Sequence, residues 1–386
     1  MTANINLPRI LRIGAEASQM LPATLKELGL SRPLLVSDAF IVSLGWLAKL
    51  QQQLDQEDIF HRSFTGVVPD PTTDAIYEGL AVLRENQHDC VVALGGGSAI
   101  DTAKTIAAMA ERDQPIRLYK VPQTLDDGLP IIAIPTTAGT GSETTRVAVI
   151  TDTETHEKML CMGLGLMPVA ALVDFELTMT MPLRLTADTG IDSLCHALEA
   201  YVSRHANPFT DTIALASMTA IAKHLRTACH EPDNRAAREA MMLAATQGGI
   251  AFSNASVTLI HGMSRPIGGL FHVPHGMSNA MLLPAVTEWS ISGAPSRYAD
   301  CARAMQLANA SDSDDQANQK LVAGLRQLCA DLQVPTPASF GISKEQWRQA
   351  IPTMAQQALD SGSPANNPRI PNAEQIAELY QGVWTN

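Results

Sequence analysis

Four side chains in the second half of the chain have the types and the spacing of a metal site. Asp192 and His196 stand four residues apart in a stretch with helical character, so their side chains share one face of the helix. His261 and His275 follow, fourteen residues apart. We expect Asp192, His196, His261 and His275 to hold one metal ion together.

The donor types narrow the choice of metal. Three imidazoles and one carboxylate suit Fe(II), Zn or another first-row ion, and they disfavour Mg and Ca, which prefer oxygen donors. The set does not choose between Fe(II) and Zn. Between His261 and His275 the residues that favour turns predict a tight turn; they are Pro266, Gly268, Gly269 and Pro274. We interpret His272 as a structural or supporting residue, and the remaining candidates as structural: His205, His224 and His230.

A glycine-rich turn in the first half suits a phosphate group. The apolar residues Val91–Leu94 lead into Gly95, Gly96 and Gly97, and Ser98 and Asp101 follow at the start of a helix. Consecutive glycines let the backbone approach an anion, and the helix N-terminus supplies free N–H groups. The pattern is neither the dinucleotide fingerprint nor the P-loop. An ordinary turn between a strand and a helix explains it equally well.

A second loop favours a dinucleotide. After the apolar run 130–135 come hydroxyl side chains that could donate to phosphate or ribose: Thr136, Thr137, Thr140 and Ser142. Asp38 ends another apolar run. A carboxylate at this place could accept a hydrogen bond from the 2′-hydroxyl of the adenosine ribose and would repel a 2′-phosphate. Asp38 could instead cap a helix. We predict that the cofactor is NAD rather than NADP.

Apolar segments in the first half predict the sheet that positions these loops. The runs 33–37, 89–94, 130–135 and 170–174 are apolar, short and closed by turn residues, with helical stretches between them. Such runs are typical of buried parallel strands with crossover helices. We therefore expect a doubly wound α/β sheet that binds ligands at the carboxyl ends of its strands.

The second half is predicted to be all-helical. Helical periodicity without strands covers Thr186–Ser203, Asp211–Cys229, Asn234–Phe252 and much of Asp315–Leu332, with a solvated loop at Ser311–Asp315. A break near Met181–Arg184 predicts an α/β NAD-binding domain at 1–183 and an all-α metal-binding domain at 184–386.

Length and composition agree with a two-domain enzyme. The chain has 386 residues, which is more than one hydrophobic core usually organises. Its net charge is −12 and its basic residues are scattered, so we expect no nucleic-acid partner. The sequence contains no apolar span of ~20 residues, so we expect no membrane helix. The first residues lack the basic and then apolar segments of a signal peptide. The six cysteines form no C-x-x-C pair, which indicates free thiols in a reducing cytoplasm.

Together these motifs resemble the iron-containing (group III) alcohol dehydrogenase family, from Gly14 to about Trp289. The matching segments are Val36–Asp38, Val68–Thr72, Gly95–Lys104, Ile134–Glu143, Thr189–Tyr201 and His272–Gly276. The resemblance implies a dinucleotide-binding N-terminal domain, a helical C-terminal domain of dehydroquinate synthase-like type, and an active site in the cleft between them. It implies an NAD-dependent alcohol dehydrogenase or aldehyde reductase that acts on small molecules as a homodimer or larger oligomer.

The resemblance also implies roles for individual residues. The family's metal ligands fall on Asp192, His196, His261 and His275. Its cofactor contacts fall on Asp38, Asp70, Gly96, Gly97, Ser98, Thr136, Thr140 and Lys158. The family usually has Asn where Asp70 stands.

One departure from the family lies beside the metal ligands. Where the family commonly has a second histidine, four residues after His261, this chain has Arg265. An arginine stays protonated and cannot exchange protons near neutrality, so proton transfer runs through water and the cofactor ribose, or Arg265 has another task. We hypothesise that it anchors an anionic substrate tail; alternatively, it pairs with a nearby carboxylate and shapes the pocket.

Other functions remain open at this point. One is a glycerol-dehydrogenase-like polyol oxidoreductase or a dehydroquinate-synthase-like zinc enzyme, which the fourth metal ligand disfavours. Another is a transhydrogenase that keeps its cofactor bound. The third is a non-catalytic protein that binds metal and nucleotide.

Overall fold

The computed structural model describes residues 2–384 and divides them into two compact units. The α/β unit runs from Asn6 to Thr180. The helical unit comprises residues 2–5 and 181–384. The domain boundary expected from the sequence, between residues 183 and 184, lies three residues after this division.

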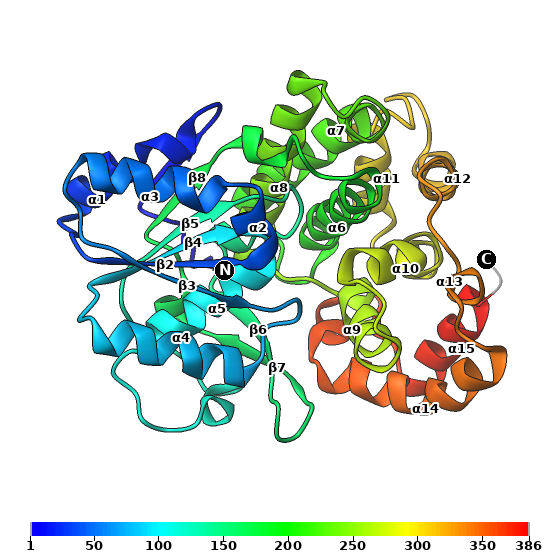
Figure 1. Ribbon diagram of the computed structural model, residues 1–386. Helices are drawn as coiled ribbons and strands as arrows, with labels where there is room; N and C mark the ends of the chain where they lie inside the picture. The colour runs from blue at the N-terminus through cyan, green and yellow to red at the C-terminus, as the bar shows by residue number, and fades with distance from the viewer. Residues whose placement is uncertain (1, 385–386) are drawn as a thin grey trace. The chain divides into compact units, whose positions relative to one another are not determined.

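Six parallel strands form the sheet of the α/β unit in the described part of the chain (Figure 1). Their order across the sheet is β1-β8-β5-β4-β2-β3. The direction of winding reverses between β2 and β4, which is the place where sheets of this kind bind ligands. All four predicted apolar strands belong to this sheet. The strands are β1 (Ile10–Ile13), β2 (Pro33–Asp38), β3 (Arg62–Val67), β4 (Cys90–Gly95), β5 (Ile131–Pro135) and β8 (Ala170–Val173).

Two hydrophobic cores lie on the two faces of this sheet, because successive side chains of a strand point to opposite faces. On one face Leu35 and Val92 pack in one core with α1 (Leu21–Leu28) and α3 (Trp46–Gln56). On the other face the neighbouring residues Val36 and Ala93 pack in a second core with α4 (Thr73–Glu85) and α5 (Gly97–Ala108). Helices on both faces explain why the strands are apolar throughout.

The α/β unit also contains an antiparallel hairpin and short helical segments. Strands β6 (Val147–Thr151) and β7 (Lys158–Met162) pair with each other. The short segments are η1 (Ala17–Met20), α2 (Ala39–Ser43), η2 (Ile116–Tyr119), η3 (Ser142–Thr144), η4 (Leu164–Leu166) and η5 (Phe175–Thr178).

The described part of the helical unit contains helices and no strand, as predicted. Its longer helices are α6 (Leu183–Val202), α7 (Pro208–His230), α8 (Arg235–Asn254), α9 (Leu259–Phe271), α10 (His275–Ser290), α11 (Pro295–Ala304), α12 (Asp314–Asp331), α14 (Lys344–Asp360) and α15 (Ala373–Val383). Shorter segments are η6 (Ile291–Gly293), α13 (Pro337–Phe340) and η7 (Ser363–Asn366).

Two details of the helical unit differ from the sequence prediction. The predicted tight turn between His261 and His275 is present but is confined to residues 272–274, because α9 continues through Pro266 and both following glycines. The helix ends only at His272, which has a left-handed φ of 55° and donates its N–H to Gly268 O. The predicted loop at 311–315 is shorter than expected, because Ser313 caps α12 in a capping box and the helix begins at Asp314.

No helix within residues 2–384 is long and apolar enough to cross a membrane. The six cysteines are free thiols, as expected from their spacing.

Candidate metal centre and nucleotide loops

Asp192, His196, His261 and His275 meet in the helical unit, as their spacing predicts. One ligand atom from each lies within 4.8 Å of the others. Asp192 Oδ1 lies 3.9, 3.5 and 3.7 Å from Nε2 of His196, His261 and His275 respectively. The first three side chains are buried, whereas that of His275 is 48% exposed. The donor cluster is therefore enclosed except on the side of His275.

Three helices bring the four ligands together. Helix α6 carries Asp192 and His196, α9 carries His261, and α10 begins with His275. A Cβ added to Gly276 would lie 2.4 Å from Asp188 O and 3.3 Å from the Cβ of Asp192. Only glycine lets the first turn of α10 lie this close to α6.

The ring of His196 is held between two other rings. Phe252 of α8 stacks on it with a centroid distance of 4.3 Å, and His261 stacks at 4.6 Å. Helix α8 approaches α6 through Gly248, where an added Cβ would lie 3.3 Å from Ser193 O. This packing fixes the ring plane of His196 before any ion binds.

Glu199 supports the ligand His261. Its carboxylate is buried and accepts hydrogen bonds from His261 Nδ1, from Thr258 Oγ1 at 2.8 Å and from the backbone N–H of Ile260 at 2.6 Å. A carboxylate at Nδ1 fixes the tautomer, so that Nε2 faces the cluster, and makes that nitrogen more basic.

Electrostatics prepare two of the ligands for a cation. Burial lowers the pKa of His196 to about 4, so this imidazole is neutral at pH 7. Burial opposes the charge of Asp192, yet the three imidazoles hold the pKa of its carboxyl below the usual range. For His261, burial is outweighed by Glu199 and Asp192, which raise its pKa to about 9. Metal binding at this cluster is therefore expected to release a proton.

The residues fit a first-row divalent ion. Three imidazole nitrogens and a carboxylate oxygen converge in a buried place, and this donor set suits Fe(II) or Zn better than Mg or Ca. The amide nitrogen of Asn279 also lies in the cluster, 2.6 Å from Asp192 Oδ1.

Arg265 lies one helical turn after His261 on α9, and the structure gives it no carboxylate partner. Its Nη1 donates to Ser363 Oγ at 3.0 Å. Among residues 2–384, Arg265 forms no ion pair within 4.0 Å. Burial lowers the pKa of its guanidinium, and Glu199 acts in the opposite direction. Arg265 therefore makes no direct ion pair with a carboxylate of the described residues, and Glu199 acts on it only through its charge.

The predicted nucleotide residues meet at the carboxyl edge of the sheet. Asp38 Oδ1 accepts from Ile41 N at 2.9 Å and caps α2, while its Oδ2 lies 3.4 Å from the place of a Cβ on Gly95. A Cβ on Gly96 would lie 3.3 Å from Thr137, and one on Gly97 would lie 2.9 Å from Thr140. Strands β2, β4 and β5 thus bring Asp38, the glycine turn with Ser98, and the threonine loop from Thr136 side by side.

A buried network joins the two loops. Lys104 Nζ donates to Ser142 Oγ, to Thr145 O and Oγ1, and to Val147 O, each at 2.9 Å. Ser142 Oγ donates to Asp101 Oδ1 at 2.7 Å, and Asp101 Oδ2 accepts from Val149 N. Burial lowers the pKa of Lys104 to about 8 and raises that of Asp101. Asp101 and Ser142, predicted as cofactor contacts, make these hydrogen bonds within the protein.

Asp70 and Lys158 form an ion pair. Lys158 Nζ, at the start of β7, lies 2.8 Å from Asp70 Oδ1, after β3. Asp70 has a left-handed φ of 55°. Both side chains were assigned to the cofactor by resemblance, and the structure places them together in the α/β unit.

Three supporting residues are absent from the sequence prediction: Glu199, Asn279 and Lys104. Glu199 stands seven residues after Asp192, and Asn279 four after His275, so each shares a helix face with a ligand. That spacing is a signal that could have indicated both. Lys104 lies in the matched glycine motif, but nothing in the sequence shows that its ammonium is buried.

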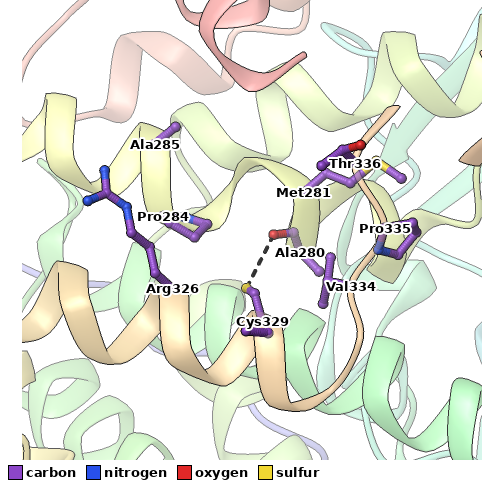
Figure 2. A pocket seen from close by; sticks show the side chains of 10 residues that line it. Ala280, Met281, Pro284, Ala285, Arg326, Cys329, Val334, Pro335 and Thr336 are labelled. Atoms are coloured by element: carbon purple, nitrogen blue, oxygen red, sulfur yellow. Dashed lines mark hydrogen bonds between the residues drawn. The ribbon is translucent and has the colours of Figure 1, made fainter. Parts of the chain in front are cut away.

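A separate cavity of about 430 Å³ lies between α10 and α12 (Figure 2). Its walls include Met281, Pro284 and Val334, and Cys329 Sγ donates to Ala280 O there. No metal ligand lines it. We assign it no part in the chemistry of the cluster.

Comparison with known proteins covers both units. A family model described as "Iron-containing alcohol dehydrogenase" matches residues 8–175, and one described as "Fe-containing alcohol dehydrogenase family, C-terminal" matches residues 186–384. The 1,3-propanediol dehydrogenase of Klebsiella pneumoniae is 35% identical over 98% of this chain and 98% of its own.

Solved structures are similar to this chain over almost its whole length. A 1,3-propanediol oxidoreductase has a TM-score of 0.95 at 34% identity and covers 99% of this chain and 100% of its own. A sulfoacetaldehyde reductase from Bifidobacterium kashiwanohense, in complex with NAD+, has a TM-score of 0.89 at 28% identity and covers 100% of both chains.

Proposed function

The chain belongs to the iron-containing alcohol dehydrogenase family, and from that premise we propose that its substrate is a small aldehyde or primary alcohol with an anionic group, which Arg265 binds. Membership makes the protein a nicotinamide-dependent oxidoreductase that interconverts alcohols and aldehydes. It also disfavours the zinc-enzyme alternative. The anionic group is the finer proposal, and one observation supports it above the others: Arg265 is a largely buried cation without an ion-pair partner.

Position and charge both support this role for Arg265. It lies four residues after the metal ligand His261, so the two side chains share one face of α9. A buried cation without a direct ion-pair partner is costly, and a carboxylate or sulfonate on the substrate would bind it through paired hydrogen bonds. The proposal is also supported by the similar structure named sulfoacetaldehyde reductase, because that name gives an aldehyde with a sulfonate group as the substrate of that protein.

The chain's own residues prepare the reacting oxygen's environment. A divalent ion held by Asp192, His196, His261 and His275 would supply Lewis acidity toward an alcohol or carbonyl oxygen. Glu199 keeps a proton on His261 Nδ1, so that Nε2 is directed to the ion. Arg265 stays protonated and orients the substrate rather than exchanging protons.

We propose NAD as the cofactor in preference to NADP. Asp38 keeps one carboxylate oxygen free of the helix cap and beside Gly95. A carboxylate there accepts from a ribose hydroxyl and repels a 2′-phosphate. The glycine turn and the threonine loop would hold the pyrophosphate and riboses, with Gly96, Gly97, Ser98, Thr136, Thr137, Thr140, Asp70 and Lys158 as further contacts. Comparing kcat/KM for NADH and NADPH in wild type and Asp38→Ser tests this: the variant should lose most of its discrimination.

We also propose a homo-oligomer. Strand β1 lies at one edge of the sheet, its last residue Ile13 and the preceding Leu7 are exposed, and an edge strand is a template for pairing. Light scattering of the purified protein would give the mass, and a monomer would contradict the proposal.

The decisive experiment compares Arg265→Ala with wild type on aldehydes matched in length, with and without a carboxylate or sulfonate. We expect kcat/KM to fall by about 10- to 100-fold on the anionic aldehydes, because hydrogen bonds to charged groups are lost, and to change little on neutral ones. Ser363→Ala, which removes only the neighbouring hydroxyl, is the matched control. An equal loss of kcat/KM on both substrate classes would show that Arg265 does not bind the anionic group.

A further inference from the structure

Asn279 contacts three of the four metal ligands. Its amide nitrogen donates to Asp192 Oδ1 at 2.6 Å. The same nitrogen lies 3.2 Å from His261 Nε2 and 3.3 Å from His275 Nε2. The side chain is fully buried.

The chemistry of the contact identifies which amide atom faces the cluster. The atoms that the ligands present here are a carboxylate oxygen and two imidazole nitrogens, and each can accept a hydrogen bond from an amide N–H. The amide oxygen of Asn279 at 2.6 Å would repel the carboxylate, so the nitrogen must point toward Asp192. The amide oxygen is then buried with no partner within residues 2–384. Buried polar atoms without partners are uncommon in folded proteins, so this side chain is not explained by packing alone.

The bond also joins two helices that carry ligands. Asn279 stands four residues after His275, so both side chains leave the same face of α10. Asp192 lies on α6, against which Gly276 packs. The Asn279–Asp192 hydrogen bond therefore fixes the orientation of the carboxylate and the distance between α10 and α6 together.

We propose that Asn279 is a positioning residue of the metal site, which holds Asp192 and His275 in the arrangement that the ion requires. The donation from Asn279 to Asp192 persists when the cluster is occupied, since a carboxylate oxygen can accept a hydrogen bond while it also binds an ion. Hydrogen-bond partners of ligating groups typically raise metal affinity by about 10- to 100-fold. Asn279 then sets how tightly this protein keeps its metal.

The test measures metal affinity, not turnover. Zn(II) affinity of the purified full-length protein is determined by competition with a chromogenic chelator for wild type, Asn279→Ala, Asn279→Leu and Asn279→Ser. We expect Ala and Leu to bind Zn(II) about 10- to 100-fold more weakly, although Leu restores the side-chain volume. Ser retains a donor and should lose less. Thr287→Val, at another buried polar position of α10, is the control and should bind as wild type does.

Thermal unfolding with and without chelator separates this role from a structural one. A positioning residue predicts that the Ala and Leu variants lose mainly the rise in Tm that Zn(II) produces, because binding stabilises the folded state. If a variant is unfolded without metal, the Zn(II) concentration at which it folds gives the same ranking.

Two outcomes would overturn the proposal. Equal affinity in all variants would remove the role of Asn279, and tighter binding in Ala or Leu would show that the amide competes with the ion. The inference rests on the metal centre of the proposed function, but the two fail separately. A wild type that binds neither Zn(II) nor Fe(II) would refute the metal centre itself.

Discussion

Glu199 carries a buried negative charge between a metal ligand and a guanidinium. It accepts a hydrogen bond from His261, and its charge favours protonated Arg265. The two cationic neighbours stand one turn apart on α9, so a single carboxylate serves both. This attraction offsets part of the cost of burying Arg265, which has no ion pair of its own, and leaves the donors that do not bond Ser363 for a substrate.

Replacing Glu199 by Gln should weaken metal binding. The amide presents only one acceptor oxygen, so either His261 or the backbone of residue 260 loses its partner, and Nε2 of His261 becomes less basic. We expect Zn(II) affinity to fall by about 10-fold or more. Chelator competition measures this, with Asp300→Asn, which disturbs a carboxylate bonded to Tyr201, as the control. Unchanged affinity would show that Glu199 serves only the fold.

The ligand residues could be predicted from sequence more readily than their supports. Asp192 and His196 share a helix face, and that spacing is visible in the chain itself. Glu199 and Asn279 also have helical spacing to ligands, but an Asn or a Glu on a helix is usually a surface residue. Their importance follows from burial between packed helices, which depends on tertiary contacts that no local pattern contains.

At the scale of the element, the first turn of α10 is the most constrained part of the metal centre. Gly276 follows the ligand His275 directly, and its Cα faces the backbone of Asp188 on α6. An added methyl group would lie 2.4 Å from a carbonyl oxygen, which is backbone and cannot move aside like a flexible side chain. The two helices would have to separate, and His275 would move away from Asp192.

Gly276→Ala should therefore lose tightly bound metal. We expect a Tm lowered by several degrees, as for an overpacked core site, and a metal content well below one equivalent after gel filtration. Gly269→Ala provides the control, because an added Cβ at Gly269 meets nothing within 4 Å. Metal analysis of both variants decides, and a fully loaded Gly276→Ala protein would contradict the argument.

The buried network of Lys104 connects the two nucleotide loops in a similar way. Ser142 Oγ bridges the ammonium of Lys104 and the carboxylate of Asp101. Ser142→Ala leaves both buried charges short of a partner, at a cost of about 1–3 kcal/mol. We expect a lower Tm and a severalfold weaker affinity for NADH in fluorescence titration, with Zn(II) affinity unchanged. Exposed Ser43→Ala is the control; equal NADH affinity would mean that the network does not shape the loops.

Element predictions succeeded where one local rule dominates. The four apolar runs became β2, β4, β5 and β8 because burial on both faces of a parallel sheet demands such runs. The expected turn between His261 and His275 lies only at residues 272–274, because the helix tolerates Pro266, although a proline costs a backbone hydrogen bond. What ends α9 is the left-handed conformation of His272, which its sequence does not reveal.

At the scale of the whole molecule, the two kinds of chemistry belong to different units. The residues proposed for the cofactor all lie in the α/β unit, and the four metal ligands all lie in the helical unit. This division was predictable from the sequence, because the pattern of alternating strands and helices changes near residue 181 to a pattern of helices alone. Each site therefore depends on the packing of its own unit.

This division predicts that metal removal acts on one site only. Protein treated with a strong chelator should lose alcohol and aldehyde turnover almost completely, because no Lewis acid remains for the substrate oxygen. Its affinity for NADH should stay within about twofold of the untreated protein, since binding energy at the nucleotide loops does not involve the ion. Fluorescence titration of NADH and turnover at 340 nm measure the two quantities on the same sample, and Fe(II) or Zn(II) should restore some activity.

Full turnover in metal-free protein would refute the role of the ion, whereas loss of NADH binding would show that the metal also organises the α/β unit.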